Sequence, residues 1–221
     1  IHTTNITAET SANYLWFSDK NYETLKGKVK CNPAIKSATD REALRKGLAE
    51  GIIDTIGSDH APHLLSEKVD NYLKCPSGMP SIQQSLSVVM TVAGIFNEGK
   101  SAEDDIPLTL SRIASAFSEK TAEILGIKER GSLKVGNYAD LIVIDPKRKY
   151  TVQSHADLVS NAPELKYSVK DIAYKCGWSP YDEQTLKGLI DKVFLNGKQV
   201  VADGCLIQGS PSGQPIAFHN L

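Results

Sequence analysis

A carboxylate and two imidazoles lie close together at Asp59-His60-Ala61-Pro62-His63. Carboxylate oxygens and imidazole nitrogens are ligands for zinc, and the same groups move protons as general acids and bases. The pattern is equally compatible with an aspartate that caps the following turn and two surface histidines. The spacing alone therefore leaves a metal or catalytic site and an ordinary loop as open alternatives.

The elements before this motif favour a functional position. Residues 40–50 contain strong helix formers with Asp40 at the start and Gly51 just after the end, which predicts a helix. The β-branched run 52–56 predicts a buried strand that ends just before the motif. Two more short strands are predicted, over residues 6–10 and 29–32. The order strand, helix, strand predicts a parallel sheet, and α/β barrels gather functional groups at the carboxyl ends of such strands.

A long loop and three helices are predicted next. Residues 64–80 are polar and contain Pro76, Gly78 and Pro80, which predicts a loop, and long loops inside compact domains are usually functional. The helices are predicted over residues 81–96, 108–117 and 119–125.

After residue 130 the pattern changes to short apolar runs separated by turns. Residues 139–145 predict a strand. Asn196-Gly197 between apolar runs predicts a hairpin, because both central residues of a type I′ turn need a positive φ. We therefore expect residues 131–221 to form a small, mainly β unit packed on residues 1–130.

The composition excludes several classes of protein. The chain of 221 residues is 41% hydrophobic and 23% charged, as in ordinary globular proteins. A net charge of -1 gives no electrostatic footprint for nucleic acid or an anionic membrane, and no apolar stretch is long enough to cross a bilayer. The scattered cysteines indicate free thiols in a reducing cytoplasm; they are Cys31, Cys75, Cys176 and Cys205.

Several segments together resemble dihydroorotases of the amidohydrolase superfamily. Residues 58–63, Ser-Asp-His-Ala-Pro-His, are similar to the motif after the last barrel strand of these enzymes. Cys31-Asn32-Pro33 resembles their Asn-Pro segment, and residues 76–80 resemble the loop whose backbone contacts the substrate ring. Residues 174–180 resemble a segment near the end of these enzymes. Residues 136–145 and Asn196-Gly197 resemble the β appendage found across the superfamily. The resemblance implies an α/β fold, with residues 1–130 as the C-terminal part of a (β/α)8 TIM-type barrel and residues 131–221 as a β appendage.

The resemblance also implies an activity and a set of residue roles. The family reaction is the reversible, zinc-dependent hydrolysis of dihydroorotate to N-carbamoyl-aspartate, with two zinc ions in a complete active site. Asp59 would ligate zinc and act as general base and then general acid. His63 and Asn32 would bind the substrate, together with the backbone of Ser77 and Gly78. Hydantoinases, dihydropyrimidinases and allantoinases generally lack the final histidine, so His63 favours a dihydroorotase.

The chain departs from the family pattern in its metal ligands. The family's His-x-His pair and lysine belong to an earlier half that this sequence does not contain, and a barrel usually needs roughly 250 residues. His2 resembles the ligand after the fifth strand, and Asn13 stands where a histidine ligand after the sixth is expected. A βα unit needs a dozen residues or more, so either a helix is missing between them or His2 is not that ligand.

Three hypotheses follow. The leading one is a catalytic dihydroorotase with a small-molecule substrate, acting as a homodimer or with a carbamoyltransferase. The second is a non-catalytic dihydroorotase-like subunit, which Asn13 favours. The third is another cyclic amidohydrolase of the hydantoinase or allantoinase type, which the string Thr7-Ala8-Glu9-Thr10 supports slightly.

Overall fold

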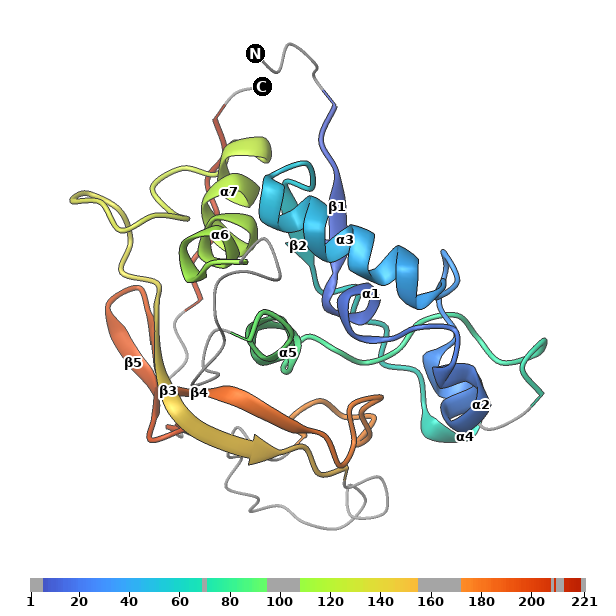
Figure 1. Ribbon diagram of the computed structural model, residues 1–221. Helices are drawn as coiled ribbons and strands as arrows, with labels where there is room; N and C mark the ends of the chain where they lie inside the picture. Colours follow the sequence, from blue (N-terminus) through green and yellow to red (C-terminus); the bar gives the residue numbers. More distant parts are fainter. Residues whose placement is uncertain are drawn as a thin grey trace.

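The computed structural model describes residues 6–68, 71–94, 108–154, 172–207, 209 and 213–219. Its first part is an α/β arrangement in which two short strands pair side by side (Figure 1). Strand β1 (Glu9–Ser11) and strand β2 (Thr55–Gly57) are parallel, with Thr10 opposite Ile56. The predicted parallel pairing is confirmed.

Helix α3 (Ala38–Glu50) is the main helix of the crossover between these strands. Its cap is Ser37 rather than Asp40, because the Ser37 side chain accepts a hydrogen bond from the Asp40 N–H while Asp40 bonds back in a capping box. Gly51 ends the helix in the left-handed conformation, with φ 79°.

The segment between β1 and α3 differs from the prediction. It forms helix α1 (Ala12–Trp16), helix α2 (Asn21–Leu25) and the 3-10 helix η1 (Lys26–Val29). Residues 29–32 are therefore not a strand. Val29 and Cys31 are both buried, as in a strand, but the backbone curls so that the Lys30 N–H donates to the Gly27 carbonyl. Pro33 adds no N–H with which a strand ladder could continue.

The helices after the motif differ from the predicted ones. The helix predicted over 81–96 is shorter, and the two predicted over 108–125 are joined. The polar loop contains a short helix α4 (Leu65–Lys68), and α5 spans Ser85–Val92. The two helices predicted over 108–117 and 119–125 form one continuous helical stretch of α6 (Leu110–Ala114), the π-helical turn η2 (Ser115–Glu119) and α7 (Lys120–Ile124). None of the described helices is both long and apolar enough to cross a bilayer.

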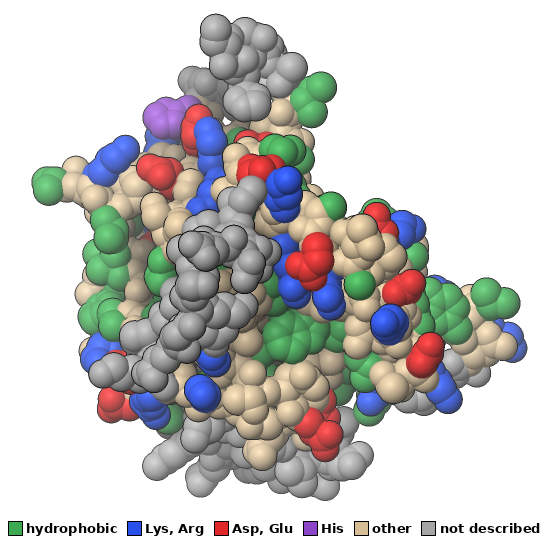
Figure 2. All heavy atoms as spheres, viewed as in Figure 1, with side chains coloured by type: hydrophobic (Ala, Val, Ile, Leu, Met, Phe, Trp, Pro, Cys, Tyr) green, Lys and Arg blue, Asp and Glu red, His purple; other side chains and the backbone are tan. Residues whose placement is uncertain are grey.

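The later part contains a four-stranded antiparallel sheet in the order β3-β4-β5-β6. Its strands are β3 (Leu141–Thr151), β4 (Thr185–Leu195), β5 (Lys198–Ala202) and β6 (Cys205–Leu206). The predicted hairpin is confirmed, because Asn196 and Gly197 join β4 to β5 with φ values of 51° and 79°. Figure 2 shows exposed apolar side chains along the left edge, on the side of the molecule that carries this sheet. The exposed large apolar residues in and around the sheet include Leu133, Val135, Ile142, Val143 and Leu206.

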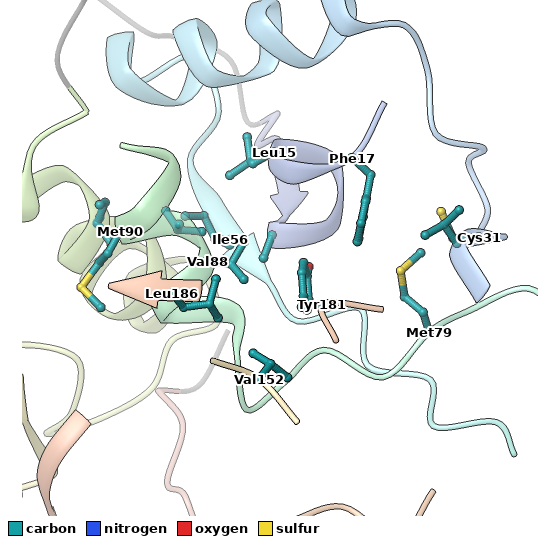
Figure 3. Packing of buried hydrophobic residues seen from close by; sticks show 14 of the residues in the cluster. Leu15, Phe17, Cys31, Ile56, Met79, Val88, Met90, Val152, Tyr181 and Leu186 are labelled. Carbon is teal, nitrogen blue, oxygen red and sulfur yellow. The ribbon is translucent and has the colours of Figure 1, made fainter. Parts of the chain in front are cut away.

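One hydrophobic cluster contains residues from both parts of the chain (Figure 3). Phe17 stacks on Tyr181 with ring centroids 5.2 Å apart, and both side chains are almost fully buried. Helix α5 packs against β4, where the Ser87 hydroxyl donates to the Gly188 carbonyl. Residues on either side of position 130 thus share a core.

Candidate active site

Asp59 follows β2 by two residues and adopts a positive φ of 48°, a conformation that aspartate tolerates better than most residues. Strand β2, which precedes Asp59, lies against the Glu9 side chain. A Cβ at Gly57 would come within 2.6 Å of the Glu9 carboxylate, which also accepts a hydrogen bond of 3.2 Å from the Thr55 hydroxyl. Two carboxylates, those of Glu9 and Asp59, therefore lie near the carboxyl end of this strand pair.

The environment of Asp59 favours its protonated form. Burial raises the pKa of the Asp59 carboxyl, and the negative charge of Glu9 raises this pKa further. Within the described ranges no hydrogen bond or ion pair to the Asp59 carboxylate is found. Asp59 is thus an uncompensated acidic group beside the end of a strand, able to take up a proton or a cation.

His60 has a structural role. Its Nδ1 accepts hydrogen bonds from the backbone N–H groups of Ser81 at 3.0 Å and Ile82 at 3.3 Å, so this nitrogen carries no proton. The ring lies edge-on to Tyr174, with centroids 5.1 Å apart. Burial lowers the pKa of His60, which favours the neutral ring that these bonds require. The side chain joins the motif to the turn before α5.

His63 is fixed at both its ring and its backbone. The Ser77 carbonyl lies 3.0 Å from His63 Nε2, and a carbonyl only accepts, so Nε2 is the donor. The His63 carbonyl accepts a hydrogen bond of 2.9 Å from the Trp178 indole N–H. The neutral ring therefore has its proton on Nε2 and an acceptor at Nδ1. Only the doubly protonated, positively charged ring could donate from Nδ1.

Most backbone polar groups of Ser77 and Gly78 are already used inside the fold. The Ser77 carbonyl bonds to His63, the Gly78 N–H donates to the Lys30 carbonyl at 2.8 Å, and the Gly78 carbonyl accepts from Lys68. Gly78 has a φ of 116°, and a Cβ there would come within 2.4 Å of the Ala61 Cβ. Of these backbone groups, the Ser77 N–H is the donor with no partner among the described residues.

Asn32 is exposed, and its neighbour Cys31 is buried within electrostatic reach of Asp59. Burial raises the pKa of the Cys31 thiol, and the negative charge of Asp59 raises it further. The Tyr14 hydroxyl donates to the Pro33 carbonyl at 2.8 Å and so ties this segment to α1. The structure thus brings the Asn32 segment toward the motif.

The interpretation of Asn13 as a replaced sixth-strand ligand stays a prediction. Asn13 lies in α1, two residues beyond the end of β1, and β1 pairs directly with β2. Asn13 is fully buried, and its Oδ1 accepts a hydrogen bond of 2.6 Å from the Tyr181 hydroxyl. The Asn13 Nδ2 atom is also buried, and it has no hydrogen-bond partner among the described residues.

A metal site is not complete within the described residues. They contain no group of three or more histidine, cysteine and acidic side chains placed to hold a metal ion. His2 lies outside the described residues. Asp59 fits a divalent cation, because its carboxylate is uncompensated, but it supplies a single ligand.

Three contributors to the site had no role predicted from the sequence. They are the Nδ1 atom of His60, the indole N–H of Trp178 and the ammonium group of Lys68. His60 and Trp178 lie in segments that carry a sequence signal, but their hydrogen-bond partners are distant in sequence. Lys68 gave no signal, because a lysine in a polar loop is ordinarily exposed.

Parallel strands joined through a helix, with polar groups gathered past the end of the second strand, define an α/β fold. Residues 1–200 match the model described as "Amidohydrolase family". The chain belongs to this family.

Relatives of this chain in several organisms are named dihydroorotases. The chain is 35% identical over 146 residues to a dihydroorotase of Trichlorobacter lovleyi, covering 66% of this chain and 32% of that protein. It is 32% identical over 204 residues to a dihydroorotase of Mycobacterium tuberculosis, covering 90% of this chain and 41% of that protein. The chain thus spans about a third to two fifths of the length of these relatives.

Solved structures agree in fold. A D-hydantoinase structure matches with a TM-score of 0.73 at 22% identity, covering 90% of this chain and 40% of that one. An L-hydantoinase (dihydropyrimidinase) from Arthrobacter aurescens matches with a TM-score of 0.74 at 23% identity, covering 92% and 41%. This likeness shows an α/β fold of the TIM-barrel type.

Proposed function

We propose that this chain is the C-terminal half of a dihydroorotase, which hydrolyses the ring amide of dihydroorotate to N-carbamoyl-aspartate and also runs in reverse in pyrimidine synthesis. The observation that carries the proposal is His63, four residues beyond Asp59 and held through Nε2 by the Ser77 carbonyl. The names of the curated relatives support the same reaction.

Asp59 is the proton carrier in this proposal. Its carboxylate takes a proton from the attacking water and delivers it to the ring nitrogen that leaves. A raised pKa supports this role, because a general acid and base works best when its pKa lies nearer the working pH.

His63 binds the substrate carboxylate. Since Nε2 donates to Ser77, His63 donates to the substrate from Nδ1 when its ring is doubly protonated, and this positive charge then strengthens the hydrogen bond. The Ser77 N–H and the Asn32 amide contact the polar groups of the ring. The Gly78 backbone, already bonded on both sides, shapes the loop.

Asp59 would hold zinc, of which a complete site would contain two. When bound, zinc would polarise the amide carbonyl and acidify the attacking water. The remaining ligands come from outside the described residues, with His2 as one candidate.

The proposed architecture is a partial barrel over residues 1–130 and a β appendage over 131–221. The two-stranded β1-β2 sheet supports a partial barrel, because a closed barrel leaves no strand edge free. We place the protein in the cytoplasm, as a homodimer or assembled with a carbamoyltransferase.

The test is metal content and dihydroorotate hydrolysis by the full-length protein, compared with Asp59→Ala. Asp203→Ala is a matched control, because Asp203 is exposed and also has a positive φ, 51°. We expect the wild type and Asp203→Ala to hydrolyse dihydroorotate and Asp59→Ala to lose nearly all turnover. An inactive, metal-loaded wild type would instead support the non-catalytic subunit, and turnover of hydantoin alone would support a hydantoinase.

A further inference from the structure

Lys68, the last residue of α4, is a buried cation in an unusual setting. Its exposed fraction is 1%, although lysines are almost never fully buried unless they are paired with an opposite charge. Among the residues that the structure describes, no carboxylate forms an ion pair with it. Burying an ammonium group is costly, so its hydrogen bonds must compensate.

Three backbone carbonyls supply those bonds. Lys68 Nζ donates to the carbonyls of Pro76 at 2.6 Å, Gly78 at 2.7 Å and Lys30 at 3.2 Å. An ammonium group has three N–H donors, so this arrangement uses all of them. Lys68 thereby joins α4, the loop around Ser77 and the segment after η1.

Lys30 forms a second clamp on the same loop. Its Nζ donates to the carbonyls of Tyr72 at 2.7 Å, Cys75 at 2.7 Å and Leu73 at 3.3 Å. Its own carbonyl accepts from both Lys68 and the Gly78 N–H. The two ammonium groups together bind most of the carbonyls between residues 72 and 78.

The clamps determine how the loop faces the site. The carbonyls on either side of Ser77 point to Lys68, and the Ser77 carbonyl points to His63. With these acceptors turned into the fold, the Ser77 N–H is left as a donor. The position of His63 depends on the same stretch, because His63 bonds to the Ser77 carbonyl.

We propose that Lys68 is a positioning residue, which holds the Ser77–Gly78 backbone in the conformation that binds the substrate. The proposal rests on the proposed function for the identity of the substrate. The clamp itself can be tested without any substrate.

The test compares Lys68→Met with Lys74→Met in the full-length protein. Methionine keeps an unbranched apolar chain but removes every donor, and Lys74 is an exposed lysine of the same loop. We expect Lys68→Met to raise the KM for dihydroorotate about tenfold or more, with kcat changed by less than about threefold, because a lost positioning contact weakens substrate binding first. Amide hydrogen exchange should accelerate at residues 77–79 and stay unchanged in α3. Lys74→Met should behave as the wild type.

Several results would overturn the proposal. One is an unchanged KM and unchanged exchange at residues 77–79 in Lys68→Met; another is a fall in kcat alone. If Lys68→Met does not fold, Lys30→Met replaces it, and unchanged exchange over residues 72–78 in that variant overturns the clamp.

In the wild type, Lys68 should resist reductive methylation while Lys74 reacts, and equal reactivity contradicts the clamp. If the wild type does not hydrolyse dihydroorotate, the proposed function fails while the exchange and methylation results still decide the clamp.

Discussion

Asp59 combines a left-handed backbone, partial burial and a neighbouring carboxylate, Glu9. Each of the last two disfavours its negative charge, and no described residue compensates that charge. Groups needed for chemistry are often kept in such unfavourable surroundings at the expense of stability. At the residue scale, we therefore expect Asp59, the proposed proton carrier, to weaken the metal-free fold.

Asp59→Asn should stabilise the metal-free protein at neutral pH. Asparagine also tolerates a positive φ, and it removes the charge. The melting temperature should rise slightly, by no more than about 4 °C, since the group is partly solvated. Because the folded-state pKa lies above the unfolded value, the destabilisation is fully present above the folded pKa and disappears below the unfolded one. The gain should thus vanish on acidification, as measured by thermal unfolding in a chelator. Asp203→Asn is the control, and an equal gain there would contradict the explanation.

The lowered pKa of His60 gives the free energy of unfolding a different dependence on pH. This pKa is lowered in the folded state, so the unfolded chain binds the proton more tightly and stability falls as the pH drops through the unfolded value, about 6.5. His60→Asn places an amide oxygen near the position of Nδ1 and does not titrate. Its unfolding free energy should therefore depend less on pH between 7 and 5 than that of the wild type, while the exposed His219→Asn should follow the wild type. Equal pH slopes in all three proteins would refute this role.

At the scale of elements, residues 172–181 contact the Asp59–His63 motif and Asn13. Tyr174 packs on the His60 ring, the Trp178 indole bonds to the His63 carbonyl, and the Tyr181 hydroxyl bonds to Asn13. A segment from the C-terminal part thus fixes the positions of residues that precede residue 64.

Trp178→Phe tests this support by removing one N–H donor while keeping most of the buried ring. The His63 carbonyl would be left unsatisfied, so we expect a loss of about 1–3 kcal/mol in unfolding free energy and a raised KM for dihydroorotate. Chemical denaturation and steady-state kinetics measure the two effects. Trp16→Phe is the control, since no hydrogen bond from its indole N–H is found in the described ranges. Equal losses in both variants would mean that ring volume, not the bond to His63, matters.

Sequence predicted the elements whose signals are local. The α3 helix has its stop signal at Gly51, and the β4-β5 turn needs only Asn196 and Gly197. The strand predicted over 29–32 was wrong. Alternating buried residues, here Val29 and Cys31, also occur in a curled segment that tertiary contacts hold in place. The bond between Trp178 and His63 joins residues 115 apart, and no local pattern encodes such a pair.

At the scale of the whole molecule, the proposed boundary at residue 130 does not divide the core. Val152, Trp178, Tyr181, Leu186 and Leu189 are all buried in the same cluster as Leu15 and Val88. The β unit is therefore part of the hydrophobic support of the site.

A variant ending at residue 130 should fail to unfold cooperatively, because the apolar surface that those side chains cover would be exposed. Thermal unfolding followed by circular dichroism measures this. A variant ending at residue 207 retains all four strands of the sheet and should still melt cooperatively. A sharp transition in the shorter variant would show that residues 1–130 fold independently.

The central claim is that His63 selects a substrate with a ring carboxylate. It is tested by kcat/KM for dihydroorotate and for dihydrouracil, the same ring without the carboxylate, in the wild type and in His63→Gln. Glutamine can still donate to the Ser77 carbonyl but cannot carry the positive charge. We expect the wild type to prefer dihydroorotate and His63→Gln to lose about 10- to 100-fold of this preference, as expected for one charged hydrogen bond. A wild type without preference, or a variant in which both substrates suffer equally, would contradict it.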